Sequence, residues 1–470
     1  MTPEASSRSS QRIYQELKQQ IEDGLKAGDP LPSSRSLVEK HQASPNTVQK
    51  VISRLIQEGL VVSRTGRGVF VAERQSPVTQ SSDFGWQSVL LGASPGLQQD
   101  FQTLYTPAPS GTIPLGSGYL DASLQPTGPL SAAIQRASRR PLIWDRVPPE
   151  GLEPLRNWFA HQLGVEAQNT LITSGAQTAL STIFGVLAHT EGIPVLVESP
   201  CHLGTLAILR ACGMRPIPVP LDQEGIRLDL LEQVLSHSQA RVLACQPTFQ
   251  NPTGICWSEH RRKEVLALCK KYGVLIVEDG AAQDLWMDTP PPPHLVTLAP
   301  DQVIHVYSLT KPVAAGLRIA AIAAHGPLLQ RIRTALVVGD LFVTGVMQEA
   351  ALELVTGAPW NKHLKGIRGS LKDRRDLMLK LLRLNLSGWS IGAVPRGGFY
   401  IWARLPEHCD EDILVARALQ QGVQINAGRP WFPAEQQGPH VRLSFAGVTL
   451  EQIQQGLAVL QQVSEWKNTP

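Results

Sequence analysis

The stretch Val303-Ile-His-Val-Tyr-Ser-Leu-Thr-Lys311 indicates the fold class of this chain. It opens with β-branched and aromatic residues, which is typical of a buried strand, and it ends in two hydroxyls and an amine. Similar short apolar runs occur at residues 195–198, 241–245 and 274–278, and helical patterns such as residues 261–271 separate them. This alternation predicts an α/β domain with a mostly parallel sheet that is covered by helices.

The chain divides into regions of different composition. Residues 113–470 contain the strand and helix alternation, and from about residue 370 they mix helix and strand as a small α+β C-terminal domain. Residues 74–112 are rich in Ser, Gln, Pro and Gly and lack periodicity, which indicates a linker. Residues 8–73 form a third region with its own apolar pattern. We therefore expect two folded parts joined by a linker.

The N-terminal region has the pattern of three helices followed by a hairpin. An apolar residue recurs every fourth position from Ile13 to Leu25, as on one face of a helix. Ser44-Pro45 supplies an N-cap and a proline at the first helical position. The glycines of Arg64-Thr-Gly-Arg-Gly68 mark the tip of a short β-hairpin. Together these signals predict a winged helix-turn-helix.

Charge is unevenly distributed along the 470 residues. The net charge is +3, and the whole excess lies in the first 75 residues, where 11 Lys and Arg accompany 8 Asp and Glu. The remaining 395 residues hold equal numbers of acidic and basic side chains. A basic excess on a small helix-turn-helix unit indicates DNA binding, so we expect affinity for nucleic acid to reside in this N-terminal head alone.

The composition excludes several other classes of protein. No apolar run approaches the roughly 20 residues of a membrane helix, and the polar start MTPEASSRSSQR lacks the apolar segment of a secretory signal. The six cysteines form no C-x-x-C pair, and the twelve histidines show no spacing of metal ligands. We expect a reduced, cytoplasmic protein without a bound metal and without a membrane partner.

Three motifs in the head point to a known family. They are G-x-x-x-G-D-x-L-P-S-S-R-x-L at residues 24–37, S-x-N-T-V at 44–48 and E-G-L-V-x-x-R-x-G-R-G-V-F-V at 58–71. This set resembles the DNA-binding domain of GntR-type bacterial regulators. The resemblance and the outward polar face of the third helix predict double-stranded DNA as partner, contacted by Arg35, Ser44, Asn46, Thr47, Gln49, Lys50, Arg64 and Arg67. Pro45 departs from the basic or polar residue common in that family, so one base contact is expected to be missing.

Four polar clusters follow predicted strands in the large domain. Ser174-Gly-Ala-Gln177 opens a helix whose backbone amides suit a phosphate, and Gln250-Asn-Pro-Thr-Gly254 forms a turn. Asp279 ends a third strand, where it could keep a pyridine nitrogen protonated. The stretch Ser308-Leu-Thr-Lys311, with Arg318 further on, offers an amine for imine formation beside groups that bind an anion. Each cluster alone also fits an ordinary turn, cap or surface lysine.

In this order and spacing, the clusters resemble the fold type I pyridoxal-phosphate aminotransferases over about residues 110–463. The resemblance implies pyridoxal 5'-phosphate as cofactor, held by Lys311 as an internal aldimine. It implies that Asp279 pairs with the pyridinium and that Asn251 binds the ring oxygen. The remaining residues implied at the cofactor are Gly175, Ala176, Gln177, His202, Ser308, Thr310 and Arg318.

Other positions bear on the substrate and on activity. Arg442 matches the arginine that grips a substrate α-carboxylate, and Trp144 stands where the family has a tyrosine near the substrate. His202 aligns with the aromatic residue that stacks on the cofactor ring. Ala282 replaces a tyrosine that is hydrogen-bonded to the ring oxygen. Cofactor binding is therefore expected to survive, whereas fast transamination is in doubt.

A GntR-type winged helix joined to an aminotransferase-like domain is the architecture of MocR-type regulators, which this chain resembles. The resemblance implies a homodimeric transcription factor that senses an amino compound, or the cofactor itself, by exchange of the Lys311 aldimine for an effector aldimine. Two alternatives stay open. The chain is an active aminotransferase with a DNA-binding domain, or its large domain is a cofactor-free dimerisation scaffold.

Overall fold

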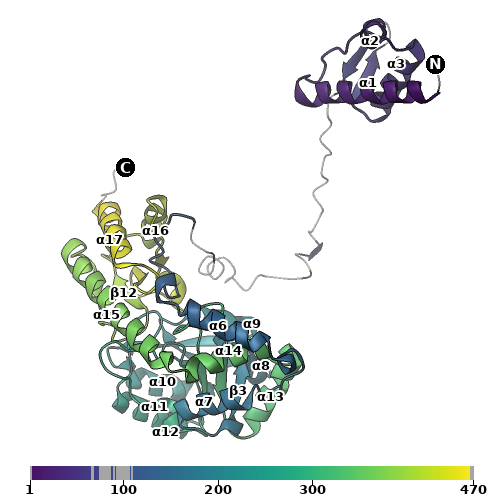
Figure 1. The fold of residues 1–470 in the computed structure, drawn as a ribbon. Coiled ribbons are helices and arrows are strands. Elements are labelled where there is room, and N and C mark those ends of the chain that lie inside the picture. Colours follow the sequence, from purple (N-terminus) through teal and green to yellow (C-terminus); the bar gives the residue numbers. More distant parts are fainter. Residues whose placement is uncertain are drawn as a thin grey trace. The chain divides into compact units, whose positions relative to one another are not determined.

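The computed structural model describes residues 3–64, 68–72, 86, 87, 90, 106 and 109–465 (Figure 1). The chain forms two compact units that divide between Gly92 and Ala93. Most of the linker predicted at 74–112 lies outside the described residues, so its boundaries stay predictions. Among the helices of the described ranges, none has both the length and the hydropathy needed to cross a bilayer.

The first unit is the predicted winged helix-turn-helix. Its elements are α1 (Pro3–Asp23), α2 (Ser34–His41), α3 (Pro45–Gln57) and the antiparallel hairpin of β1 (Val61–Arg64) and β2 (Gly68–Val71). The side chain of Ser33 caps α2 and that of Ser44 caps α3, each by accepting a backbone N–H three residues ahead. Apolar side chains of all three helices form one core, to which Ile13, Leu17 and Leu55 contribute fully buried residues.

The second unit is built on an eight-stranded sheet. Its strands are β3 (Thr170–Thr173), β4 (Pro194–Ser199), β5 (Arg215–Asp222), β6 (Gly225–Ile226), β7 (Val242–Cys245), β8 (Leu275–Asp279), β9 (Val303–Ser308) and β10 (Ala320–Ala323). The strand order is β3-β10-β9-β8-β7-β4-β5-β6. The central pairs from β9 to β5 are parallel, whereas β10 runs antiparallel to both of its neighbours and β6 to β5. The prediction of a mostly parallel sheet is confirmed.

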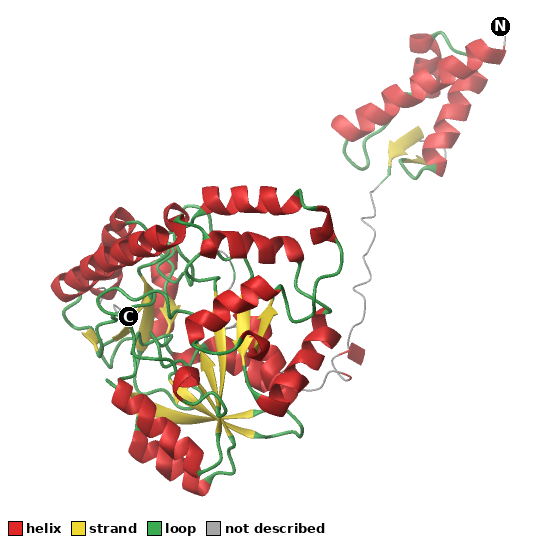
Figure 2. Ribbon diagram, turned by 60° about the horizontal axis from the view of Figure 1, so that its bottom comes forward, coloured by secondary structure: helices red, strands yellow, loops and turns green. Residues whose placement is uncertain are grey.

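Helices cover both faces of this sheet (Figure 2). They are α6 (Thr127–Ser138), α7 (Glu153–Leu163), α8 (Ala176–Leu187), α9 (Leu203–Ala211), α10 (Leu228–His237), α11 (Glu259–Lys271), α12 (Leu295–Leu298), α13 (Gly326–Asp340) and α14 (Gly345–Thr356), with short 3₁₀ turns η1 (Ala122–Leu124), η2 (Pro141–Trp144) and η3 (Ala167–Asn169). Alternate residues of a strand enter different cores, Ile276 one and Val277 the other, because side chains alternate across a strand.

The chain ends in the predicted small α+β domain. It comprises α15 (Pro359–Asn385), β11 (Ser390–Ile391), β12 (Tyr400–Arg404), α16 (Glu411–Gln420), β13 (Asn426–Ala427), η4 (Arg429–Trp431), β14 (His440–Ser444) and α17 (Leu450–Glu465). Its four strands pair antiparallel in the order β11-β12-β14-β13. The central strand β14 carries Arg442, which the packing directs toward the large sheet.

Candidate functional site

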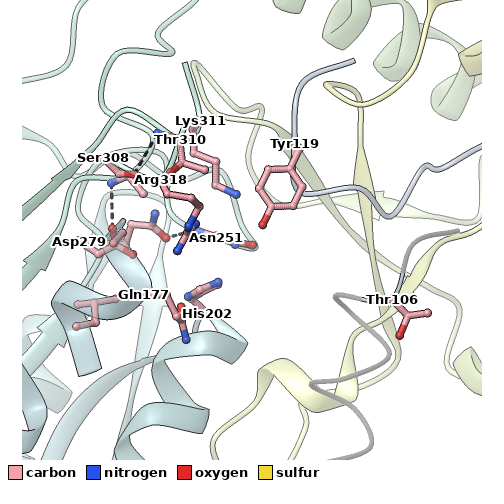
Figure 3. Close-up of a pocket in the computed structure, with 14 residues that line it drawn as sticks. Thr106, Tyr119, Gln177, His202, Asn251, Asp279, Ser308, Thr310, Lys311 and Arg318 are labelled. Atoms are coloured by element: carbon pink, nitrogen blue, oxygen red, sulfur yellow. Dashed lines mark hydrogen bonds between the residues drawn. The ribbon is translucent and has the colours of Figure 1, made fainter. Parts of the chain in front are cut away.

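A cavity of about 740 Å³ lies where β7, β8 and β9 end and α8 begins (Figure 3). Its lining residues are Thr106, Tyr119, Ala176, Gln177, Leu180, His202, Gln246, Asn251, Asp279, Ala281, Ser308, Thr310, Lys311 and Arg318. Every residue predicted at the cofactor is among them except Gly175, which directly precedes Ala176. The carboxyl ends of parallel strands are the usual place for a ligand in this kind of sheet, and they bring these residues together here.

Lys311 follows β9 and extends its amine toward Tyr119, as Figure 3 shows. Its Nζ donates to the carbonyl oxygen of Gly118 at 2.6 Å and lies 4.5 Å from the centre of the Tyr119 ring. Burial lowers the pKa of Lys311 to about 8, and the nearby cations Arg442 and Arg318 act in the same direction. A larger share of neutral amine at physiological pH makes this lysine a better nucleophile.

Asp279 is the last residue of β8 and is 8 % exposed. Its carboxylate accepts the backbone N–H of Ala281 at 2.9 Å. Burial raises the pKa of Asp279 to about 6, although that hydrogen bond and Lys311 oppose the shift. A buried carboxylate at this position is suited to bind a protonated ring nitrogen.

The N-terminus of α8 and the end of β9 form an anion cradle. Gly175 has φ +95°, and a Cβ at this position would lie 2.7 Å from Nη2 of Arg318. That guanidinium donates to the carbonyl oxygen of Ser174 at 3.1 Å. The buried Thr310 hydroxyl has no hydrogen-bond partner within the described residues, and Ser308 lies beside it. A helix N-terminus, a guanidinium and two hydroxyls together fit a phosphate group.

Asn251 and Arg442 meet at the side of the cavity. The amide oxygen of Asn251 accepts Nη1 of Arg442 at 3.2 Å, so the amide nitrogen remains to donate. Arg442 is only 2 % exposed and lies 4.2 Å from the ring centre of Tyr400 and 4.3 Å from that of Trp431. Its Nη2 donates to the carbonyl oxygen of Gly116 at 2.8 Å. Arg442 therefore stands behind Asn251 and does not itself line the cavity.

The loop that carries Asn251 is held by hydrogen bonds that lead, through Gln246, to the buried side chain of Glu198. Glu198 is 2 % exposed and accepts the backbone N–H of Gln246 at 2.9 Å, and the amide oxygen of Gln246 accepts the N–H of Asn251 at 2.8 Å. Burial raises the pKa of Glu198 to about 8. Neither Glu198 nor Gln246 was expected from the sequence, where an isolated Glu at a strand end carries no specific signal.

Two further residues bear on how a ring would sit in the cavity. Burial lowers the pKa of His202 to about 3, with Lys311 and Arg442 adding to the effect, so its imidazole is neutral and suited to stacking. Ala282 is 9 % exposed and belongs to the apolar core, whereas Ala281 lines the cavity. Tyr119, which was not predicted, is the phenol that lines it.

Trp144 does not line the cavity. It is 70 % exposed, and its indole N–H donates to the carbonyl oxygen of Ser138 at 3.0 Å. Leu142, Val338 and Leu341 are 84 %, 83 % and 65 % exposed. We call these four residues the apolar patch. Its α13 end is tied to the anion cradle, because the hydroxyl of Ser174 donates to Asp340 at 2.8 Å.

A second cluster of ionisable groups lies behind β8. Ligand atoms of Glu278, His294 and His305 lie within 4.8 Å of one another. The Glu278 carboxylate already accepts the backbone N–H groups of Leu295 and Val296 and contacts His305 at 2.8 Å. These contacts account for the cluster as a buried ion network that holds α12 against the sheet.

The head presents most of its predicted DNA contacts on the surface. Ser44, Asn46, Gln49, Lys50 and Arg64 are exposed, and the Arg35 side chain is 91 % exposed. Thr47 requires a correction. It was predicted to face outward, but it is 5 % exposed and its hydroxyl lies 2.8 Å from that of Ser44, because it belongs to the helix cap. Arg67 lies outside the described residues.

Comparisons with known proteins agree with both units. Residues 112–460 match the family of class I and II aminotransferases, and residues 9–71 match the bacterial regulatory proteins of the gntR family. The uncharacterized HTH-type transcriptional regulator YdfD of Bacillus subtilis is 28 % identical over 95 % of this chain and 94 % of its own length. The 2-aminoadipate transaminase of Thermus thermophilus is 33 % identical over 66 % of this chain and 79 % of its own.

A solved structure gives the same result for the second unit, Ala93–Pro470, which we call the body. The α-aminoadipate aminotransferase LysN of Thermus thermophilus, crystallised with N-(5'-phosphopyridoxyl)-L-leucine, superposes with a TM-score of 0.74 at 30 % identity. The match covers 81 % of this chain and 97 % of that structure. The ligand of that structure is a phosphopyridoxyl compound, and the cavity of this chain has an anion cradle and an amine that suit such a compound.

Proposed function

This chain belongs to the aminotransferase class I and II family and carries a gntR-type winged helix, the architecture of MocR-type regulators, and from this premise we propose how it works. It is a pyridoxal-phosphate-dependent, DNA-binding transcriptional regulator. An amino compound, or the cofactor itself, is sensed in the body and changes the binding of DNA by the head. The observation that carries this proposal is the combination, in one chain, of a cofactor cavity with an exposed recognition helix.

Pyridoxal 5'-phosphate fits the side chains of the cavity. When bound, it supplies a carbonyl carbon that forms an imine with amines and a ring that withdraws electrons. Lys311 would attach it through the amine whose pKa is lowered. Asp279 would keep the ring nitrogen protonated, and the buried hydroxyl of Thr310 would donate to the phosphate. The amide N–H of Asn251 would donate to the ring oxygen.

Arg442 lies behind Asn251 and does not line the cavity, and in our proposal it recognises the carboxylate of an amino-acid effector by giving up a hydrogen bond within the protein. Its planar guanidinium is held between Tyr400 and Trp431, so little rotational freedom is lost on binding. The carboxylate takes the place of a partner that Arg442 now has, the carbonyl oxygen of Gly116. In this recognition the buried guanidinium of Arg442 exchanges one hydrogen-bond acceptor, the Gly116 carbonyl, for another, the effector carboxylate. The buried charge is therefore never left without a partner.

Two basic side chains of the site hold the same short segment of chain. Lys311 donates to Gly118 at 2.6 Å and Arg442 donates to Gly116 at 2.8 Å. This segment follows the predicted linker within a few residues. A lysine that is bound to the cofactor gives up Gly118, and an arginine that is bound to a carboxylate gives up Gly116. Release of residues 116–118 is the step by which occupancy of the cavity reaches the linker, through contacts that differ between the two states.

The Lys311→Ala variant tests this mechanism. It should abolish the visible absorbance of the lysine-bound cofactor. Because it also removes the bond to Gly118, it should shift the affinity for operator DNA in the direction that attachment of the cofactor shifts the cofactor-free wild type. The control is Lys362→Ala, an exposed lysine of α15, which should change neither property.

Two results would contradict the proposal separately. A wild-type protein without the absorbance band, or a band that persists in Lys311→Ala, rejects the cofactor assignment. A Lys311→Ala variant that binds DNA like the ligand-free wild type rejects the role of residues 116–118 while leaving the cofactor in place.

A second candidate function, steady transamination, is favoured by the cavity and by the 33 % identity to a transaminase. Ala282 argues against it, because it replaces the tyrosine that donates a hydrogen bond to the ring oxygen in the aminotransferases that this chain resembles, and alanine has no such donor. Sustained conversion of an amino acid and keto acid pair at enzyme-like rates would establish the enzyme. A single half-reaction without turnover supports the sensor.

A homodimer in the cytoplasm completes the proposal. The residues of the apolar patch, Leu142 and Trp144 of η2 and Val338 and Leu341 at the C-terminal end of α13, expose four large apolar side chains, and exposed apolar surface often marks a contact with another protein. We assign a second copy of the chain as its occupant. Two copies supply two heads, as a two-fold symmetric operator requires.

A further inference from the structure

The exposed face of α3 is a single stripe of polar residues. Its buried face consists of Thr47, Val48, Val51, Ile52 and Leu55. The opposite face carries Asn46, Gln49, Lys50, Ser53 and Gln57, and Pro45, Arg54 and Ile56 are the other exposed residues of α3. These five recur at the helical spacing of three, four, seven and eleven positions, so they point in one direction along the whole helix.

The stripe is made mostly of neutral hydrogen-bonding side chains. Three of its five side chains are carboxamides, one is a hydroxyl and only Lys50 is charged. The arginine of α3 is engaged within the head. Its guanidinium lies 3.9 Å from the ring centre of Tyr14 and donates to Glu58 at 3.0 Å and to Gln11 at 3.1 Å. Within α3, all of which the structure describes, no arginine remains to read guanine.

A carboxamide matches one base edge in the major groove. It donates one hydrogen bond and accepts another, which pairs it with N7 and N6 of adenine, whereas guanine offers two acceptors and is read by arginine or lysine. The N-terminal residues of a recognition helix are those that reach base edges. Asn46 and Gln49 lie in the first two turns of α3, and Gln57 lies in its last turn.

We propose that Asn46 and Gln49 each read an adenine in the major groove, so that every operator half-site carries two A·T pairs at the positions under α3. This inference rests on the proposed function as a DNA-binding regulator and specifies its partner. The two residues are separated by three positions, a rise of about 4.5 Å along the helix. Base pairs rise about 3.4 Å each, so the two A·T pairs are adjacent or separated by one pair.

Lys50 lies on the same stripe and has two available partners. It binds guanine next to the A·T pairs or a backbone phosphate. Removal of a guanine contact relaxes the sequence preference at one position, whereas removal of a phosphate contact lowers the salt dependence by about one unit and leaves the preference unchanged.

Selection of sites from random DNA duplexes by the full-length chain tests the inference. The wild type should enrich half-sites with two A·T pairs. Asn46→Ala and Gln49→Ala should each lose the preference at one of these positions, by about tenfold or more. Gln57→Ala is the matched control, because it removes the same carboxamide from the same exposed face at the far end of α3 and should leave the selected sequence unchanged.

The outcomes separate this inference from the proposed function. Selected half-sites with G·C pairs under α3, or preferences that neither Asn46→Ala nor Gln49→Ala alters, overturn the assignment to adenine while the regulator stands. A wild-type chain that selects no sequence at all overturns both. All three substituted side chains are exposed, and equal thermal unfolding of the variants checks that the head remains folded.

Discussion

Single residues of the body show how burial prepares a site for a ligand. Burial raises the pKa of Asp279 to about 6 and that of Glu198 to about 8, and it lowers the pKa of Lys311 to about 8. For Asp279 and Lys311 the cofactor offers a partner of complementary chemistry. Glu198 lies behind the loop of Asn251, so no ligand compensates it. Its protonation state is therefore part of the stability of the protein itself.

The Glu198→Gln variant should be more stable than the wild type at alkaline pH. Because the pKa of Glu198 is raised from 4.5 to about 8, the folded protein retains a proton that the unfolded chain releases within this window. The stability that this group contributes is present below the lower value and is lost as the pH rises toward the upper one. Glutamine keeps an oxygen to accept the N–H of Gln246 and carries no charge.

The gain should reach roughly 2–4 kcal/mol above pH 8 and vanish near pH 4.5. Urea unfolding of the cofactor-free protein at both pH values measures it. The exposed glutamate of Glu259→Gln is the control, with an expected change of at most about 0.5 kcal/mol. An equal effect of Glu198→Gln at both pH values would show that titration of this carboxyl is not the cause.

At the scale of elements, local periodicity predicts the central strands and fails at the edge. The four apolar runs of the sequence analysis coincide with β4, β7, β8 and β9, although the runs at 241–245 and 274–278 begin one residue before their strands. β5 was not predicted, because its sequence Arg-Pro-Ile-Pro-Val-Pro-Leu-Asp carries a proline at every second position. Because the prolines alternate with other residues, the N–H groups between them all point to the same side of β5, where one neighbouring strand can accept them. That strand is β4, which pairs with β5 along its length. β6 contacts only its last two residues, so the prolines cost few ladder bonds there.

The turn between β3 and α8 should tolerate no side chain. In Gly175→Ala, the methyl group meets a backbone with φ +95° and lies 2.7 Å from the guanidinium of Arg318. Both the strained backbone and the displaced guanidinium disturb the anion cradle, so the affinity of the cofactor-free protein for pyridoxal 5'-phosphate should fall about tenfold or more.

Titration of absorbance or of tryptophan fluorescence measures this loss. Gly185→Ala provides a matched control in the same helix, because nothing lies within 4 Å of its added Cβ and its φ is not in the left-handed region. It should leave the affinity unchanged. Equal behaviour of the two variants would remove the N-terminus of α8 from the phosphate site.

At the scale of the whole molecule, the two units differ in charge and in exposed apolar surface. The head carries the basic excess and the body is neutral, which agrees with DNA binding by the head and with binding of a small charged ligand by the body. The apolar patch has a separate role in our proposal, in which it is the surface that a second copy covers. Its end at α13 is connected to the anion cradle through Asp340 and Ser174.

The Val338→Glu variant should convert the dimer to a monomer. It places a charge at a side chain that is 83 % exposed in the single chain and would be buried between two copies. Light scattering should report half the mass, and binding to an operator with two half-sites should weaken. Leu384→Glu is the control, because this side chain is 66 % exposed at the end of α15, outside the apolar patch. A Val338→Glu protein with the mass of the wild type would place the dimer contact elsewhere.

The sequence by itself determined which residues stand at the ends of strands and helices. Asp279, Lys311 and the turn of Gly175 follow from short apolar runs and local turn chemistry, and Asn46 follows from the cap and stripe of one helix. These features depend on neighbours within a few positions, so they can be predicted without knowledge of the fold.

Only the tertiary structure decided how these residues are used. The bond from Lys311 to Gly118 joins positions 193 apart, and that from Arg442 to Gly116 joins positions 326 apart. Burial likewise withdrew Thr47 from the DNA-facing surface into the helix cap. Contacts of this kind depend on packing between distant segments, which leaves no periodic trace in the chain, so the sequence could not show that Lys311 and Arg442 both donate to residues 116–118.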